Sequence, residues 1–203
     1  MLVTDGQRVG LGTGSTVAHL LPALAARGLA EVRCAATSPA TEREARALGL
    51  VVMSLDELGT LDIAIDGADQ VDPRGWLIKG GGAAQTREKI VAAAARRFVV
   101  IVSCEKAVAE LSPPVPVEIL RFGAEATLRA IAPAKLREAP PSPDGNLIAD
   151  YLGPVEDPEQ VARWLSATPG LIEHGLFPPS LVSDILIAGE DGVEHRRGGK
   201  PPG

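Results

Sequence analysis

Short apolar runs alternate with amphipathic segments through the first hundred residues, and this alternation limits the possible folds more than any other feature. One segment has apolar residues at the i, i+3, i+4, i+7 spacing of a single helix face: Val17, Leu20, Leu21 and Leu24. Strands are expected at 8–12, 31–36, 51–54, 61–65 and 98–102, and further helices at 41–48 and 85–97. Strands that alternate with helices predict an α/β protein with a mostly parallel sheet and helices on both faces.

The pattern changes near Pro113-Pro114-Val115-Pro116. Beyond it, strands are expected at 117–120, 146–152 and 171–177, and helices at 124–131 and 157–166. We therefore expect a Rossmann-like catalytic domain over residues 1–113 and a smaller α+β domain over 114–183. A strand near 184–193 is expected to complete the first domain, and the polar tail over 194–203 is expected to be disordered.

Composition excludes several classes of function. A net charge of −6 disfavours nucleic acid as a partner, because that affinity comes largely from Lys and Arg neutralising phosphates. Cys34 and Cys104 form neither a disulfide framework nor a zinc pattern, so buried free thiols in a reducing compartment are expected. The histidines His19, His174 and His195 match no metal-ligand spacing. No run reaches the roughly 18 apolar residues of a membrane span and no signal peptide is visible, which predicts a cytoplasmic protein.

Residues 10–16, Gly-Leu-Gly-Thr-Gly-Ser-Thr, join the first strand to the first helix. Uncovered N–H groups at a helix start form an anion site, and Ser15 or Thr16 is expected to cap this helix. The dinucleotide pattern fails because Ser15 stands where a glycine is required, and no lysine completes a P-loop. The hydroxyl-rich loop suits a single phosphate or a sugar hydroxyl, and the alternative is a plain strand-to-helix turn.

A pair of carboxylates follows the buried strand 61–65, in the motif Asp66-Gly67-Ala68-Asp69. In an open parallel sheet this position is the carboxyl edge, where ligands bind. The alternative is ordinary turn chemistry, in which Asp69 only caps a neighbouring element.

Lys79 precedes three consecutive glycines, and Glu88 follows them by six residues. Glycines leave backbone N–H groups open to a ligand at a cost in backbone entropy, so a run of three points to function. Glu88 is a candidate general base, or else a helix-start residue that the helix dipole stabilises. Lys106, after the strand 98–102, is a second candidate cation, or a solvated loop lysine.

Taken together, these segments resemble the type A ribose-5-phosphate isomerases. The specific blocks are Asp66-Gly67-Ala68-Asp69, Lys79-Gly80-Gly81-Gly82-Ala83-Ala84 and Thr86-Arg87-Glu88-Lys89. Pro116-Val117-Glu118 and Asp144-Gly145-Asn146 extend the resemblance into the second half, so that it covers nearly the whole chain.

The resemblance implies interconversion of ribose 5-phosphate and ribulose 5-phosphate, in the non-oxidative pentose phosphate pathway, without a metal or organic cofactor. It places the proton-transferring base on Glu88, with Asp66, Asp69 and Lys79 as further catalytic residues. The implied substrate-binding residues are Thr13, Gly14, Ser15, Thr16, Gly80, Gly81, Gly82 and Lys106. A homodimer or homotetramer is implied as well. The chemistry agrees, since one carboxylate can take a proton from one carbon and return it to the next.

Two departures from the family leave alternatives open. The sequence begins almost at the first strand, whereas the family has a preceding helix, so a catalytically weakened sugar-phosphate-binding module is one alternative. A related enzyme such as an amino-sugar-phosphate deaminase is another. Pro140, Pro141 and Pro143 stand where the family has a strand, which we expect to be shortened or confined to an edge.

Overall fold

The computed structural model describes residues 2–200, which divide into two compact units. The first takes the chain up to Gly67, then Arg87–Cys104 and the segment from Pro179 onward. The second takes Ala68–Thr86 and Glu105–Pro178. The predicted boundaries at 113 and 183 are therefore wrong, chiefly because Ala68–Thr86 joins the second unit.

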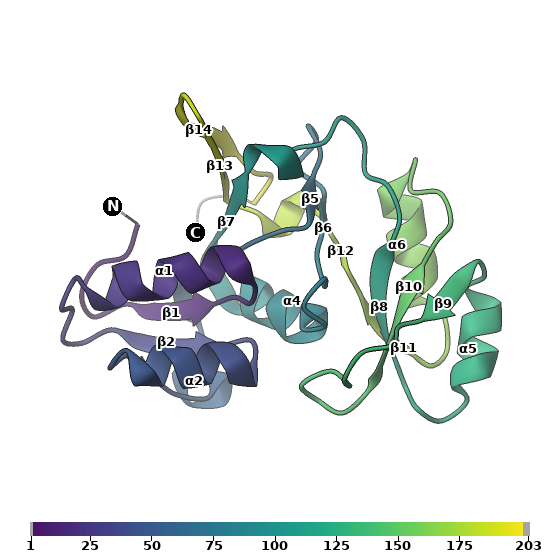
Figure 1. Ribbon diagram of the computed structural model, residues 1–203, viewed down its shortest axis with the longest axis horizontal. Helices are drawn as coiled ribbons and strands as arrows, with labels where there is room; N and C mark the ends of the chain where they lie inside the picture. Colours follow the sequence, from purple (N-terminus) through teal and green to yellow (C-terminus); the bar gives the residue numbers. More distant parts are fainter. Residues whose placement is uncertain (1, 201–203) are drawn as a thin grey trace. The chain divides into compact units, whose positions relative to one another are not determined.

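The first unit is built on a seven-stranded sheet of order β14-β13-β7-β4-β1-β2-β3. Its strands are β1 (Arg8–Leu11), β2 (Arg33–Ala36), β3 (Val51–Val52), β4 (Leu61–Asp66), β7 (Ala95–Ser103), β13 (Asp184–Gly189) and β14 (Gly192–Arg197). Every neighbouring pair is parallel except β13 and β14 (Figure 1). The prediction of a mostly parallel sheet is confirmed, as is the return of the 184–189 strand to it.

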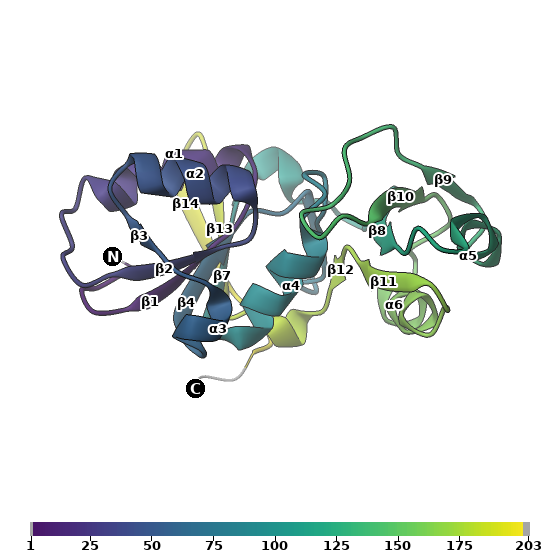
Figure 2. The same cartoon turned by 90° about the horizontal axis from the view of Figure 1, so that it is seen from below.

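Helices cover both faces of this sheet. Figure 2 shows α1 (Ser15–Ala25) and α2 (Pro39–Ala47) on one side, with α3 (Leu55–Leu58) and α4 (Gln85–Ala94) on the other. The α1 face predicted from its spacing is the buried one, since Val17, Leu21 and Leu24 join the strand residues of the core. Burying each such side chain stabilises the fold by about 1.5–3 kcal/mol.

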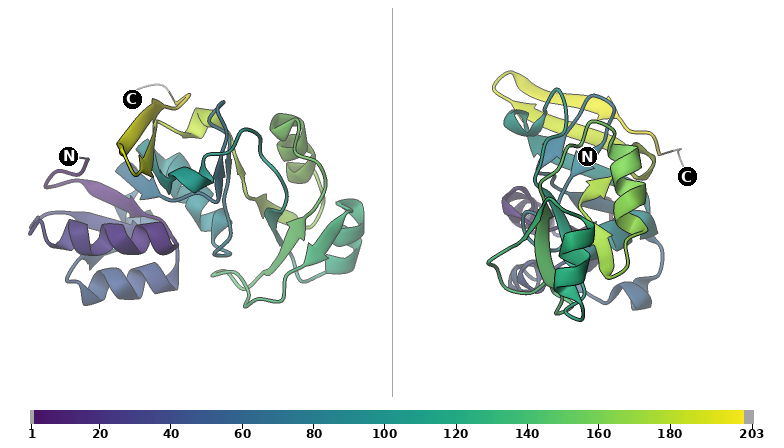
Figure 3. Two further views of the ribbon diagram at one scale, coloured as in Figure 1. Left: turned by 45° about the horizontal axis from the view of Figure 1, so that its top comes forward. Right: turned by 90° about the vertical axis from the view of Figure 1, so that its right-hand side faces the viewer.

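The hairpin β13–β14 corrects the predicted tail (Figure 3). Residues 192–197 form a strand, with His195 opposite Leu186, whereas the prediction places them largely in a disordered tail. The pattern missed this strand because β14 is almost wholly exposed, so its order comes from backbone hydrogen bonds and not from a buried face. The end of the predicted tail, 201–203, lies outside the described residues.

The second unit is α+β, as predicted. It holds a four-stranded antiparallel sheet, β11-β8-β10-β9, and a three-stranded sheet, β12-β6-β5. Their strands are β5 (Gln70–Val71), β6 (Leu77–Ile78), β8 (Val115–Ile119), β9 (Ala134–Leu136), β10 (Leu147–Tyr151), β11 (Leu171–His174) and β12 (Leu176–Phe177). Helix α5 (Ala124–Ala130) packs against β9, and α6 (Pro158–Ser166) against β11. The core of this unit includes Ile119, Ile131 and Leu165.

The single strand expected at 171–177 is instead two strands in different sheets. The break falls at Gly175, where a Cβ would lie 2.0 Å from the Lys79 carbonyl oxygen, so only glycine allows this close backbone approach. The strand expected to be shortened by prolines is short, because β9 ends at Leu136 before they begin.

Candidate active site

The glycine loop and the first carboxylate lie at the switch point of the parallel sheet. Strand order runs from β1 to β3 in one direction and from β4 to β7 and β13 in the other. The loop follows β1, and Asp66 ends the neighbouring β4. Ligands of open α/β sheets bind in the crevice at this point.

Asp66 braces the glycine loop. Its side chain is buried, and its Oδ1 accepts the backbone N–H of Thr13 at 3.1 Å and of Gly67 at 2.7 Å. A Cβ on Gly12 would stand 1.9 Å from the same oxygen, so the loop and the carboxylate interlock. The first unit thus brings Asp66 together with the predicted substrate loop.

The loop presents hydroxyls and N–H groups without a side-chain cap. Gly14, not Ser15 or Thr16, is the N-cap of α1, with φ +113° and no side-chain hydrogen bond, so the predicted cap is wrong. Ser15 is exposed, and the uncapped amides of the first turn suit an anion. Thr13 Oγ1 lies 2.7 Å from Thr37 Oγ1. Thr37 was missed, although it follows β2 at this same edge and strand order predicts its place.

Glu88 lies in the first turn of α4, which begins at Gln85 as predicted. Its side chain is only 3% exposed. The positive end of the helix dipole stabilises a carboxylate at this position. A carboxyl group this well shielded from bulk water is a candidate for acid–base work.

The second unit brings together Asp69, Lys79 and the glycines. Asp69 precedes β5, and its Oδ2 accepts the N–H of Gly81 at 2.8 Å. Lys79 follows β6 and is 3% exposed, with its Nζ 5.5 Å from the centre of the Phe177 ring. This ring stabilises the ammonium through a cation–π contact.

The predicted residues therefore fall into two groups, one in each unit. The first unit holds Thr13, Gly14, Ser15, Thr16, Asp66 and Glu88, and the second holds Asp69, Lys79, Gly80, Gly81, Gly82 and Lys106. Lys106 ends the short 3₁₀ turn Cys104–Lys106. Its side chain is exposed and makes no hydrogen bond or ion pair within residues 2–200.

The sequence pattern did not indicate two polar networks, of which the second is buried. Arg137 donates to the carbonyl oxygens of Gly80 and Gly81. Glu118, 1% exposed, accepts hydrogen bonds from Thr86, Ser142 and Asn146. Neither network has a local signal, because its members come from segments far apart in the chain.

The two thiols differ. Cys34 is buried, and burial raises its pKa to about 11. Cys104 is exposed, so the prediction that both are buried is wrong for Cys104, which follows the end of β7. Within residues 2–200, no group of three His, Cys, Asp or Glu side chains is arranged to hold a metal ion. No helix in that range is long and apolar enough to cross a bilayer.

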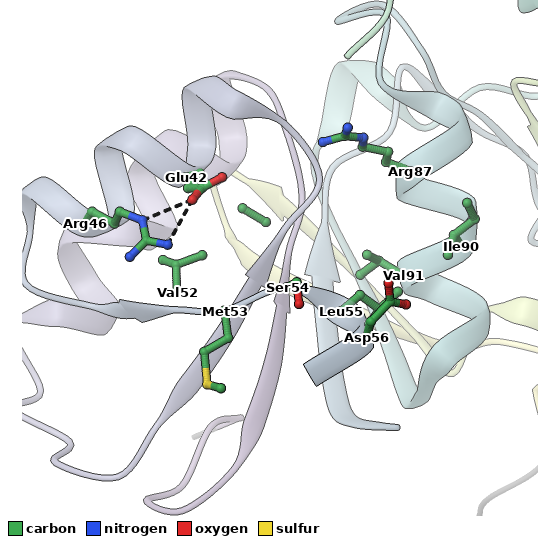
Figure 4. A pocket seen from close by; sticks show the side chains of 11 residues that line it. Glu42, Arg46, Val52, Met53, Ser54, Leu55, Asp56, Arg87, Ile90 and Val91 are labelled. Atoms are coloured by element: carbon green, nitrogen blue, oxygen red, sulfur yellow. Dashed lines mark hydrogen bonds and ion pairs between the residues drawn. The ribbon is translucent and has the colours of Figure 1, made fainter. Parts of the chain in front are cut away.

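A hollow of about 540 Å³ lies in the first unit between α2, α3 and α4 (Figure 4). The Glu42–Arg46 ion pair lies on one side of it and Arg87 on another, around Ser54. None of the predicted site residues lines it, and its charges balance. The hollow is therefore separate from the groups that carry the candidate chemistry.

A hydroxyl-rich loop and a buried carboxylate at the switch point of a parallel sheet are typical of α/β enzymes that act on small polar substrates. The family model described as ribose 5-phosphate isomerase A (phosphoriboisomerase A) matches residues 33–192. The chain belongs to this family.

Individual relatives match nearly the full length. Ribose-5-phosphate isomerase A of Caulobacter vibrioides is 43% identical over 207 residues, covering 95% of this chain and 91% of that protein. The structure of ribose 5-phosphate isomerase A from Methanocaldococcus jannaschii superposes with a TM-score of 0.91 at 33% identity, covering 97% and 93% of the two chains. A D-ribose-5-phosphate isomerase in complex with phospho-erythronic acid, 32% identical, has the same TM-score and coverage.

Proposed function

We propose that this chain interconverts ribose 5-phosphate and ribulose 5-phosphate by proton transfer through an enediolate. In the open-chain aldose, a base removes the proton on C2 and the electrons pass to the aldehyde oxygen. Return of that proton to C1, with movement of a hydroxyl proton from O2 to O1, gives the ketose. The family to which the chain belongs supports this reaction, as do the residues available for each step.

Glu88 is the proposed base. One carboxylate can carry the proton between adjacent carbons, and such catalysis contributes about 10²–10⁴-fold to the rate. Its burial in the first turn of α4 supports the assignment, because bulk water would compete for the transferred proton.

The remaining predicted residues have proposed roles that follow from their surroundings. Lys79, with the amides of the glycine turn, stabilises the negative oxygen of the enediolate. Asp69, less buried than Asp66, moves protons between the sugar hydroxyls. Asp66 instead holds the glycine loop in shape through Thr13 and Gly67.

The substrate phosphate is assigned to Thr13, Gly14, Ser15 and Thr16, together with Lys106. The observation that carries the proposal is the hydrogen bond from the Thr13 N–H to Asp66. It fixes the uncapped start of α1 at the carboxyl edge of the sheet, where a phosphate finds free N–H groups.

The test is a coupled isomerase assay on Glu88→Gln. We expect kcat to fall by about 10²–10⁴-fold, with the circular dichroism spectrum and KM little changed. Glu44→Gln, at an exposed position of α2, is the matched control and should keep full activity. A Glu88→Gln enzyme with near-normal kcat would remove this residue from the base role. Parallel turnover of a hexosamine phosphate tests the deaminase alternative, and calorimetric binding of ribose 5-phosphate without turnover would indicate a binding module.

Phospho-erythronic acid provides an independent probe. Its carboxylate places negative charge on two oxygens, as the enediolate does, so it should bind more tightly than the substrate. We expect competitive inhibition with an inhibition constant below KM, and weaker inhibition of Lys79→Met.

We further infer a homodimer or homotetramer in the cytoplasm. The family resemblance supports the assembly and the absence of a membrane-spanning helix in residues 2–200 is compatible with the location. Light scattering coupled to size-exclusion chromatography measures the assembly, and fractionation of cells measures the compartment.

A further inference from the structure

Arg137 holds the glycine turn from one side. Its Nη1 lies 3.0 Å from the carbonyl oxygen of Gly80 and 3.3 Å from that of Gly81. Its other nitrogens, Nε and Nη2, donate to the two carboxylate oxygens of Asp150 at 3.1 and 2.5 Å. The side chains of this ion pair are 20% and 21% exposed, so the pair is partly shielded from water.

These contacts determine where the N–H groups of the turn point. In a trans peptide the C=O of one residue and the N–H of the next face opposite ways. Because the Gly80 carbonyl faces Arg137, the Gly81 N–H faces away and reaches Asp69 Oδ2 at 2.8 Å. The Gly81 carbonyl also faces Arg137, so the Gly82 N–H points away from it too. Among the described residues, that N–H has no acceptor.

The turn needs such a clamp. Gly80 has φ +108° and Ala83 has φ +61°, and three successive glycines carry no side chain that would restrict their peptide planes. One backbone hydrogen bond, from Ala83 N–H to Gly80 O at 3.0 Å, closes the turn. Charged hydrogen bonds from a guanidinium add orientation that this single bond does not give.

We propose that Arg137 is a positioning residue for the isomerisation. It fixes the two glycine peptide planes so that the Gly82 N–H remains available to a substrate oxygen on the Asp69 side of the turn. This inference rests on the proposed function of Lys79 and the glycine turn. Arg137 itself contacts the carbonyl side of the turn, and so acts on the substrate only through the backbone.

Arginine suits this task and lysine does not. The planar guanidinium binds the Asp150 carboxylate with two nitrogens and keeps a third for the two carbonyls. A lysine ammonium is a single compact donor that cannot hold this fork. The Arg137→Lys variant thus keeps the charge and removes the orientation.

Steady-state kinetics of Arg137→Lys test the proposal. Loss of a donor to a developing oxyanion costs about 10²–10³-fold in kcat, and a misoriented donor should cost less, about 10–100-fold. We expect this fall in kcat with KM changed less than about threefold. Arg121→Lys is the matched control, because Arg121 also donates to a backbone carbonyl, that of Gly145 at 2.8 Å, away from the turn. It should retain full activity.

Chemical rescue separates positioning from simple stability. Guanidinium ion at millimolar concentration should restore part of kcat to Arg137→Ala without raising its unfolding temperature, and Asp150→Asn should show a smaller fall in kcat. Wild-type kcat in a folded Arg137→Lys enzyme overturns the proposal. So does failure of both Arg137→Lys and Asp150→Asn to fold, since the pair would then be structural. If Lys79→Met and Glu88→Gln instead retain activity, the proposed site is refuted. The effect of Arg137→Lys on kcat can still be measured in that case, so the two failures are distinguishable.

Discussion

The Asp66 carboxylate fills the space that a side chain on residue 12 would need. A Cβ on Gly12 would stand 1.9 Å from both Cγ and Oδ1 of Asp66. The glycine is thus required by the neighbouring strand end, whatever substrate the loop holds. The glycine loop and the end of β4 at Asp66 and Gly67 are therefore two halves of one interlocked structure.

Gly12→Ala tests this relationship. The new methyl must push Asp66 away from the Thr13 and Gly67 amides, so we expect a loss of about 1–3 kcal/mol in the free energy of unfolding and a large loss of activity. Gly67→Ala is the control for stability, since its Cβ would meet no atom closer than 3.7 Å. Urea denaturation measures both variants. Equal stability of the two would contradict the interlock.

Lys106→Ala is expected to raise KM about tenfold or more for ribose 5-phosphate with little change in kcat. A lysine bound to a phosphate in the ground state and the transition state alike contributes uniform binding, which appears in KM. Lys135→Ala, at another exposed lysine of the second unit, is the control. An unchanged KM in Lys106→Ala would exclude the phosphate contact.

Gln85→Leu is expected to stabilise the protein. The side-chain amide of Gln85 is fully buried, and neither of its polar atoms has a hydrogen-bond partner within residues 2–200. An unsatisfied buried amide costs about 1–3 kcal/mol, and an apolar group of similar size avoids that cost. The unfolding temperature should rise by several degrees.

The control for this change is Gln70→Leu. The Gln70 amide exchanges hydrogen bonds with the backbone of Ser112, so its removal should lower the unfolding temperature. A lower unfolding temperature for Gln85→Leu as well would contradict the prediction.

Asp184 should make stability depend on pH at the acidic end. Burial raises the pKa of this carboxyl, but hydrogen bonds from Arg97 and His195, each at 2.7 Å, outweigh it and lower the pKa. A carboxyl whose pKa is depressed on folding stabilises the protein above its unfolded pKa of about 3.9, and loses that contribution as pH falls through the folded pKa.

Asp184→Asn should therefore lower the free energy of unfolding by about 1–3 kcal/mol at pH 7, because charge-assisted hydrogen bonds are lost. The difference in free energy of unfolding between this variant and the wild type should become smaller as pH falls below about 4. Arg97→Gln should also lower the free energy of unfolding at pH 7. Denaturant titrations from pH 7 to pH 3 check this, and a difference from wild type that stays constant over this range would contradict it.

The two cysteines should differ in reactivity. Cys104 is exposed, whereas burial raises the pKa of Cys34 to about 11 and keeps it as a thiol at neutral pH. We expect a maleimide to modify Cys104 within minutes and Cys34 only after denaturation, as read by peptide mass spectrometry. Modification of Cys34 in the native protein at a comparable rate would contradict its burial.

The strand-loop-helix order of the first unit could be predicted because each element carries its own signal. The spacing of Val17, Leu21 and Leu24 indicates the buried face of α1. Asp66 follows an apolar run that a parallel sheet must bury. Residues at strand ends then share an edge by topology alone. This rule predicted that the glycine loop lies beside Asp66. It also predicts that Thr37, which follows β2, lies at the same edge.

The features that the sequence pattern did not predict depend on contacts between segments far apart in the chain. Strands β5 and β6 have two residues each, too short for any periodicity, so the sequence pattern left Ala68–Thr86 in the first domain. Arg137 lies before a proline-rich stretch with no motif around it, and its partners are 57 and 13 positions away. Strand β14 is ordered by its edge pairing alone, and no buried face marks it in the sequence.

Strand β13 enters the sheet beside β7, pairing Asp184 with Val99, although nearly the whole second unit is encoded between them. During synthesis, therefore, β7 leaves the ribosome with one edge unpaired, and that edge stays unpaired until β13 has been synthesised. An open edge of this kind is a site of aberrant pairing between chains. The nascent protein is accordingly most vulnerable to aggregation after the second unit has been made and before the last strands emerge.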